Sequence, residues 1–183
     1  MAIRKIAKMF YHKGVVVKIY PSDEQRRIVA VNDGASRFVY NKLVERDKLY
    51  RMRKAEPLVP AYHNHIAYLD WSLQSAENMK TAYPFLAEPE IDSCAIGMAK
   101  SNFFDAITNM FERHTGRPQY KHKSAEQSYQ TSCSNANTEN PSVQILDQHH
   151  LKLPKLGKIR FDGSPKVISD VMNRIHCLFS FFK

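Results

Sequence analysis

The sequence predicts an α+β fold in which a small β-barrel is interrupted by a helical insert. Three features of the 183-residue chain support this prediction. A β-branched and aromatic run precedes Pro21, hydrophobic residues then recur at helical spacing, and after Gly116 short alternating runs are separated by proline and glycine. We therefore divide the chain into the first barrel strands over residues 1–21, a helical insert over 22–115 and the remainder of the barrel over 116–183.

The first strand is expected over Gly14–Pro21, because its β-branched residues suit a buried strand and the proline cannot donate to a sheet ladder. Ser22 followed by Gln25 has the spacing of a capping box, so a helix should begin there. We expect this helix to end near Asn32–Gly34 and a second helix to run from Gly34 to about Lys54, which gives a helix-turn-helix-like pair. Two helices joined by a glycine turn are also common packing geometry, so the pair by itself is weak support for binding in a DNA groove.

Two further helices are expected over residues 62–74 and 91–114, and they make the middle of the chain a small helical bundle. Phe38, Leu43 and Leu49 are predicted core residues. The polar, turn-rich run Ser132–Pro141 is predicted to be a loop. The predicted strands of the second barrel segment are Gln127–Cys133, Val143–Leu146, His149–Leu153, Lys158–Phe161 and Val167–Val171.

Charge is segregated along the chain. Lysine and arginine number 27 against 18 acidic residues, so the formal net charge is +9. Residues 1–54 carry 14 basic and 5 acidic side chains, residues 55–112 carry 2 and 8, and residues 113–183 carry 11 and 5. Two basic ends that flank an acidic middle favour a polyanionic partner, although a solvated basic surface explains the charge equally well.

The sequence gives no sign of a metal site, a cofactor or a membrane segment. Cys94, Cys133 and Cys177 are far apart and lack zinc-ligand spacing, and the eight histidines show no ligand pattern either. No uncharged apolar stretch is long enough to cross a bilayer. We expect a soluble, cytoplasmic protein with no metal, no cofactor and no membrane partner.

Four phrases follow one another along the chain: Lys18–Pro21 (KIYP), Ser36–Asn41 (SRFVYN), Gly116–Lys123 (GRPQYKHK) and Leu151–Gly157 (LKLPKLG). In their order and spacing they resemble the TnpB (OrfB) family of transposon-encoded RNA-guided nucleases. The resemblance covers nearly the whole chain, and it depends on the four phrases together.

The resemblance implies a wedge barrel of the oligonucleotide-binding type with a helical recognition insert, as in type V CRISPR effectors. Full-length relatives are RNA-guided DNA endonucleases that continue into a RuvC-like nuclease with a zinc ribbon, and we expect this chain to lack both. No catalytic residue is nominated, because Asp162 and Asp170 fit a turn and a strand end. The implied function is binding of guide RNA and of a DNA motif beside the target, at the nucleoid of a prokaryotic cell, with a separate nuclease half as a further partner that this arrangement allows.

The candidate nucleic-acid contacts form three groups: one on the helix after Gly34, one in the basic segment after residue 112, and one around LKLPKLG. They are Arg37, Tyr40, Asn41 and Arg46; Arg113, Arg117, Tyr120, Lys121 and Lys123; and Lys152, Lys155 and Lys158. Cationic and aromatic side chains suit phosphates and unstacked bases. Each group also has a structural explanation: Tyr40 packs and Asn41 caps a turn, the basic segment is a solvated linker, and the lysines protect a sheet edge.

The resemblance also places Tyr62, Ser93, Gly97 and Ser134 where relatives read the DNA motif. Relatives often carry longer polar side chains at the positions of Ser93 and Gly97. A glycine inside a helix costs roughly 1 kcal/mol against alanine, so Gly97 indicates either a close backbone approach or relaxed selection.

Two other functions remain open. The chain could be a transposon remnant without activity of its own, whose apolar residues Leu178, Phe179, Phe181 and Phe182 are left exposed. It could also be a helix-turn-helix regulator that binds DNA alone, in which case Arg37→Ala should abolish duplex binding without affecting RNA.

Overall fold

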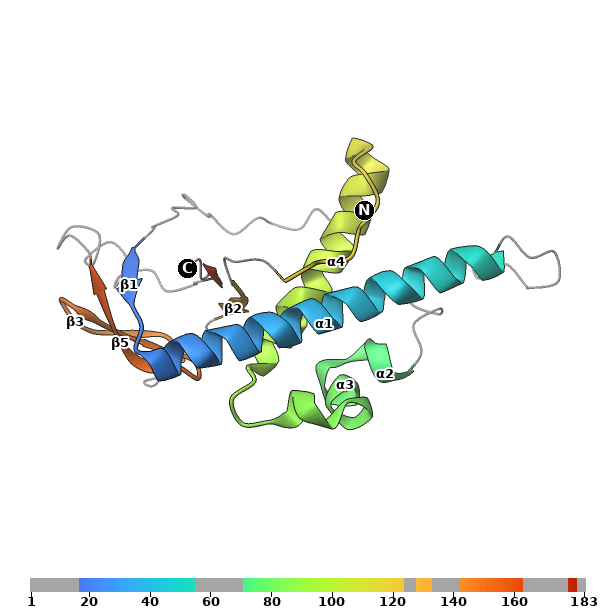
Figure 1. Cartoon of the computed structure of the whole chain (residues 1–183). Helices are drawn as coiled ribbons and strands as arrows, with labels where there is room; N and C mark the ends of the chain where they lie inside the picture. The colour runs from blue at the N-terminus through green and yellow to red at the C-terminus, as the bar shows by residue number, and fades with distance from the viewer. Residues whose placement is uncertain (1–16, 55–70, 124–127, 133–141, 163–177, 181–183) are drawn as a thin grey trace, which may run out of the picture.

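A computed structural model describes residues 17–54, 71–123, 128–132, 142–162 and 178–180, and these residues form an α+β structure (Figure 1). A long helix carries a sheet near its N-terminal end and a group of shorter helices along its length (Figure 1). The elements are β1 (Lys18–Tyr20), α1 (Asp23–Lys54), α2 (Trp71–Gln74), α3 (Ala76–Ala82), the 3-10 helix η1 (Pro84–Ala87), α4 (Ser93–Arg113), β2 (Gln130–Ser132), β3 (Gln144–Asp147), β4 (His150–Leu153), β5 (Gly157–Asp162) and β6 (Leu178–Ser180).

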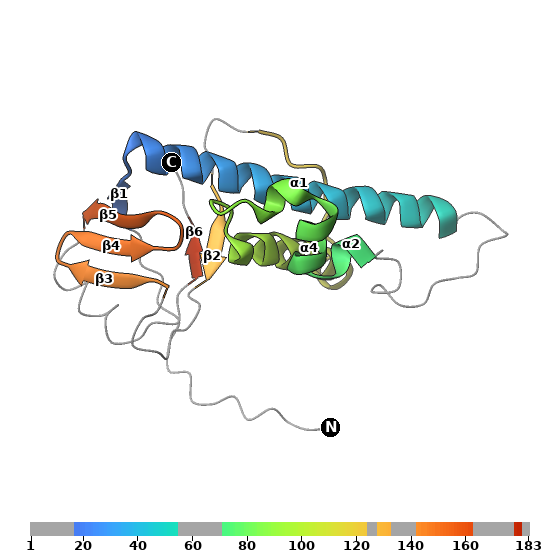
Figure 2. The same cartoon turned by 90° about the horizontal axis from the view of Figure 1, so that it is seen from below.

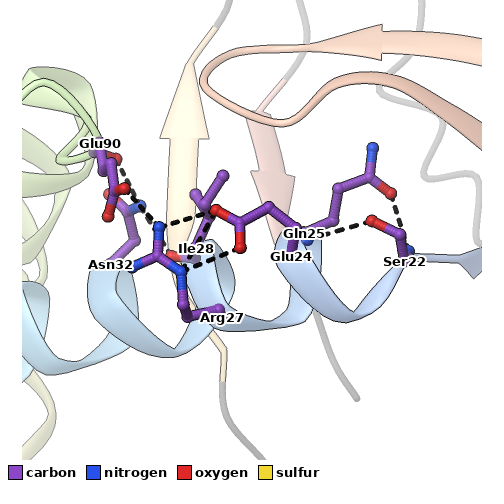
Figure 3. Close-up of polar contacts among 7 residues, drawn as sticks. All are labelled: Ser22, Glu24, Gln25, Arg27, Ile28, Asn32 and Glu90. Carbon is purple, nitrogen blue, oxygen red and sulfur yellow. Dashed lines mark hydrogen bonds and ion pairs between the residues drawn. The ribbon is translucent and has the colours of Figure 1, made fainter.

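The start of α1 confirms the predicted capping box. The Ser22 backbone N–H donates to Gln25 Oε1 at 2.9 Å, and the Gln25 backbone N–H donates to Ser22 Oγ at 3.3 Å (Figure 3). Each side chain thus satisfies one of the backbone donors that a helix start leaves without an intrahelical acceptor. Gln25 Nε2 also donates to the carbonyls of Leu156 and Lys158, at 2.9 and 2.8 Å, so the same side chain joins the helix start to the sheet.

The predicted break between two helices at Asn32–Gly34 is wrong, because α1 is one continuous helix of 32 residues. Asn32 favours a helix end by local preference, but here its amide Nδ2 donates to the Ile28 carbonyl one turn earlier and to the Glu90 carbonyl, both at 2.9 Å (Figure 3). The amide is therefore used inside the helix and in a tertiary contact. Gly34 lies within the helix, and its cost of roughly 1 kcal/mol is too small to end a helix that is packed on both sides of it.

The helical layer is built where α4 crosses α1 (Figure 1). Leu43, on α1, and Phe103, on α4, are fully buried in a core that α2, α3 and η1 complete. Phe38 is partly buried and stacks edge-on against Tyr83 and Phe85. The prediction that Leu49 belongs to the core is wrong, since this side chain is 40% exposed.

Four strands form an antiparallel sheet in the order β1-β5-β4-β3, and β2 pairs with β6 in a separate two-stranded sheet (Figure 2). The inner face of the larger sheet presents Leu151, Ile159 and Phe161 to Val29 of α1 and Ala95 of α4. The residues that the structure describes do not form the predicted small barrel as a closed one: β1 and β3 are open edges there, and β2 pairs with β6 and not with the larger sheet. The strand predicted at Val167–Val171 lies outside the described residues.

A buried polar junction joins the two helices to β2. Asp92, the N-cap of α4, donates its backbone N–H to Asn32 Oδ1 at 2.8 Å and accepts from the Cys94 N–H at 2.9 Å. Its second carboxylate oxygen accepts from the hydroxyl of Thr131. Asn32, Asp92 and Thr131 are all buried, so these hydrogen bonds satisfy groups that water does not reach.

Candidate nucleic-acid interface

The basic segment 113–123 leaves the end of α4 and lies against α1. His114 caps α4 in the left-handed conformation, with φ of 52°, and the following residues run back to α1 (Figure 1). There the Asn41 amide donates to the Lys121 carbonyl at 2.9 Å and accepts from the Lys121 N–H at 2.8 Å. Both polar atoms of Asn41 thus hold the backbone of the segment in place.

Two cation–aromatic contacts strengthen this attachment. Lys121 Nζ lies 4.2 Å from the centroid of the Tyr40 ring, and Lys48 Nζ lies 4.0 Å from that of the Tyr120 ring. Partial burial of the Lys121 ammonium against Tyr40 lowers its pKa from the usual value, and burial raises the pKa of Tyr40. Tyr40 is therefore a core residue whose ring supports the basic segment, whereas Tyr120 is exposed on its surface.

Arg37 lies on the same side of α1, but its side chain is already in an ion pair within the chain. Its guanidinium pairs with Asp33 at 2.6 Å, and both side chains are mostly buried. The other oxygen of Asp33 accepts from the Ser128 N–H at 3.3 Å. Arg37 and Asn41 do share one face of the helix, as their spacing predicts, but the chain covers much of that face itself. Their direct contact with nucleic acid stays a prediction, as does that of the half-buried Arg46.

The cations at the surface of the segment are Arg113, Arg117 and Lys123. All three are exposed. No ion pair engages them within the ranges that the structure describes. Arg117, Tyr120 and Lys123 flank Lys121, whose backbone Asn41 fixes, whereas Arg113 is the last residue of α4. This combination can contact phosphates without a large loss of conformational entropy on binding.

The third predicted group lies on the larger sheet. Lys152 of β4 and Lys158 of β5 are exposed partners directly opposite each other, and Lys155 is exposed in the connecting turn with φ of 62°. Lys158 Nζ is 4.0 Å from Asp147 Oδ2. The Asp147 carboxyl has a pKa below its usual value, first because it accepts the His149 backbone N–H and then because of His150 and Lys158.

Three further residues lie on this sheet face: Lys18 and Tyr20 of β1, which were not predicted as contacts, and Arg160 of β5. The alternation in the strand, exposed at Lys18 and Tyr20 and half-buried at Ile19, could have identified the first two. Lys18 Nζ and the Arg160 guanidinium lie 5.2 and 5.4 Å from the centroid of the Tyr20 ring.

The residues predicted to read a DNA motif are placed only in part. Ser93 and Gly97 lie one turn apart on the exposed side of α4, and Lys80 Nζ donates to Ser93 Oγ at 2.5 Å. No atom lies within 4 Å of the point where a Cβ at Gly97 would be, so no close approach within the described chain explains this glycine. Tyr62 and Ser134 lie outside the described residues.

A protein-family model matches part of the chain. Residues 9–54 match the OrfB_IS605 family model, which describes a helix-turn-helix domain. The match supports a relationship to the OrfB transposases of the IS605 group. It covers about a quarter of the chain and spans β1 and α1, where the structure has one continuous helix. No curated protein matches the chain.

No group of three histidine, cysteine or acidic side chains that could hold a metal ion is found within the described ranges. In the same part of the chain, no helix is both long enough and apolar enough to cross a membrane.

Proposed function

We propose that this chain is the nucleic-acid-binding part of a transposase-associated protein of the TnpB/OrfB type, which binds guide RNA and target-adjacent DNA and does not cleave them by itself. The observation that carries the proposal is the basic segment: the exposed Arg117, Tyr120 and Lys123 flank Lys121, whose backbone two Asn41 hydrogen bonds hold against α1. The helix-turn-helix family match supports DNA binding by residues 9–54, which include the helix α1 that holds this segment.

The chemistry of the segment favours contacts to the sugar–phosphate backbone. Arg113, Arg117 and Lys123 can neutralise phosphates whatever the base sequence. Each neutralised phosphate releases a counterion, so that affinity falls steeply as salt rises. The fixed backbone of the segment limits the ordering cost of these contacts. Guide RNA is the tighter partner in this proposal, because a folded RNA offers both phosphates and unstacked bases to Tyr120.

The double variant Arg117→Ala/Lys123→Ala of the full chain tests the proposal. We expect weaker binding to unrelated RNA sequences, and the slope of log affinity against log salt should become shallower by about 1.4 on single-stranded RNA. Fluorescence anisotropy at several salt concentrations measures both quantities. The matched control Arg26→Ala/Lys80→Ala removes two cations outside the segment and should keep the wild-type slope. Unchanged affinity in the first variant would refute the role of the segment.

A DNA-only regulator is the second candidate, and the helix-turn-helix family match favours it. Arg37→Ala should then abolish duplex binding and leave RNA binding intact. Under our proposal Arg37→Ala weakens both modestly, because it leaves Asp33 without its partner beside the basic segment. Incubation of the wild-type chain with labelled DNA and Mg²⁺ addresses chemistry: cleavage by the chain alone would end the binding-only proposal.

A further inference from the structure

The outer face of the four-stranded sheet is a second cationic surface, separate from the basic segment. Alternation along the strands places apolar residues on the inner face and charged residues on the outer one. The outer face carries four cations and two carboxylates around one exposed aromatic ring: Lys18, Lys152, Lys158 and Arg160, Asp147 and Asp162, and Tyr20.

The strand register arranges these side chains in rows across the sheet. Tyr20 of β1 pairs with Arg160 of β5, which pairs on its other side with His150 of β4. In the neighbouring row Lys158 of β5 pairs with Lys152 of β4. Arg160 and Lys158 lie two residues apart on one strand, about 7 Å, which is close to the separation of successive phosphates in an extended nucleic-acid strand.

The Lys152–Lys158 pair is unfavourable in the free protein. Like charges directly opposite each other on one sheet face destabilise the pairing. Asp147 lies 4.0 Å from Lys158 and offsets only part of this repulsion, while Lys152 has no carboxylate partner among the described residues. An anion between the two ammonium groups would replace repulsion with attraction.

Tyr20 is 42% exposed, and its ring contacts two cations, those of Lys18 and Arg160. Exposed cation–aromatic contacts contribute only about 0.5–1 kcal/mol. Stacking of a base on an aromatic side chain contributes about 1–3 kcal/mol. A base can therefore displace a cation from the ring, and the displaced cation then lies beside the phosphates of the same strand.

We propose that this sheet face binds an unpaired nucleic-acid strand, with one base stacked on Tyr20 and the adjacent phosphates on Arg160, Lys158 and Lys152. A base within a duplex is already stacked and paired, so its face is not available to the ring. Binding at this sheet face adds a second contact surface to the proposed function. It does not depend on the basic segment, because the residues of that segment lie on other elements.

Variants at Tyr20 in the full chain test the stacking. Tyr20→Leu should weaken binding of an unstructured oligouridine 12-mer about tenfold, whereas Tyr20→Phe should bind as the wild type does, since it keeps the ring. A 12-base-pair duplex should bind all three proteins equally. An oligothymidine 12-mer measured in parallel identifies whether RNA, DNA or both occupy the face. Equal oligomer binding by Tyr20→Leu and wild type, or an equal loss on the duplex, would overturn the proposal.

Lys152→Gln gives a test that does not depend on Tyr20. It relieves the repulsion from Lys158, so the thermal midpoint should rise, while oligouridine binding weakens and its salt slope becomes shallower by about 0.7. A purely structural lysine would lower the midpoint or leave binding unchanged, and either result contradicts the proposal. Lys80→Gln on α3 is the charge-matched control. The Arg117→Ala/Lys123→Ala variant in the same assay separates failure of this face from failure of the basic segment.

Discussion

Gly34 occupies the middle of α1, where nothing in its surroundings requires a glycine. Apart from the backbone of its own helical turns and its two chain neighbours, no described atom lies within 4 Å of the point where its Cβ would be, and its φ is not positive. Gly157, in contrast, has φ of 65° at the start of β5, a conformation that other residues adopt only with strain. The two glycines therefore differ in what a methyl group would do.

Gly34→Ala should raise the free energy of unfolding by roughly 0.5–1 kcal/mol, because alanine loses less backbone entropy in a helix. Gly157→Ala, the matched control, should lower it by about 1 kcal/mol because it forces alanine into the left-handed region. Urea unfolding followed by circular dichroism measures both changes. Destabilisation by Gly34→Ala would mean that the chain turns at Gly34 after all, as two helices joined at this point require.

The sequence could predict the role of a residue where its partners lie close by along the chain. The Ser22–Gln25 capping box was predictable because both partners lie within one helical turn. The role of Asn32 was not, because its partners Glu90 and Asp92 are about 60 residues away and only the tertiary fold brings them to the helix. The local conformational preferences of Asn32 and Gly34 predict a helix end, but the long-range contacts outweigh these preferences.

At the scale of elements, the basic segment depends on α1 for its position. The predicted group of cations was recognisable from composition, but the sequence does not reveal that Asn41 fixes the backbone of Lys121 from 80 residues away. The four predicted strands that correspond to β2, β3, β4 and β5 were located within a few residues, whereas β6 was not among the predicted strands. The assembly of the strands into an open sheet and a separate β2–β6 pair depends on which edges meet. Hydrophobic periodicity predicts where helices and strands lie, but it does not show which of them pack or pair with one another.

Asn41→Ala should release the segment from α1. Each of the two lost hydrogen bonds contributes about 1 kcal/mol, so local opening should increase roughly tenfold or more. Limited trypsin digestion detects this as faster cleavage after Lys121 and Lys123 in the otherwise folded protein. Gln119→Ala is the control, because among the described residues that side chain bonds to the nearby Arg117 carbonyl and not to α1. Equal cleavage rates in the two variants would show that Asn41 does not hold the segment.

At the scale of the whole molecule, two hydrophobic clusters share the same two helices. The helical cluster contains Val39 of α1 and Phe103 of α4, and the sheet cluster contains Val29 of α1 and Ala95 of α4. Both helices therefore pass through both clusters, and the buried Asn32–Asp92–Thr131 junction lies where they meet. Such continuity favours one cooperative unit over two independently folding parts.

We expect the isolated chain to unfold in a single transition. The slowest-exchanging amide hydrogens of α4 and of β4–β5 should then give the same free energy of opening. Asn32→Ala leaves the Asp92 N–H and the Glu90 carbonyl without their partner, which should cost about 3 kcal/mol and lower the protection of both regions equally. Hydrogen exchange read by mass spectrometry resolves the two regions. A transposon remnant that folds poorly would instead show weak protection without a cooperative transition. If Asn32→Ala destabilised the helices and left the sheet protected, the junction would not couple the two clusters. The basic segment and the sheet face would then bind nucleic acid as parts of separate folding units.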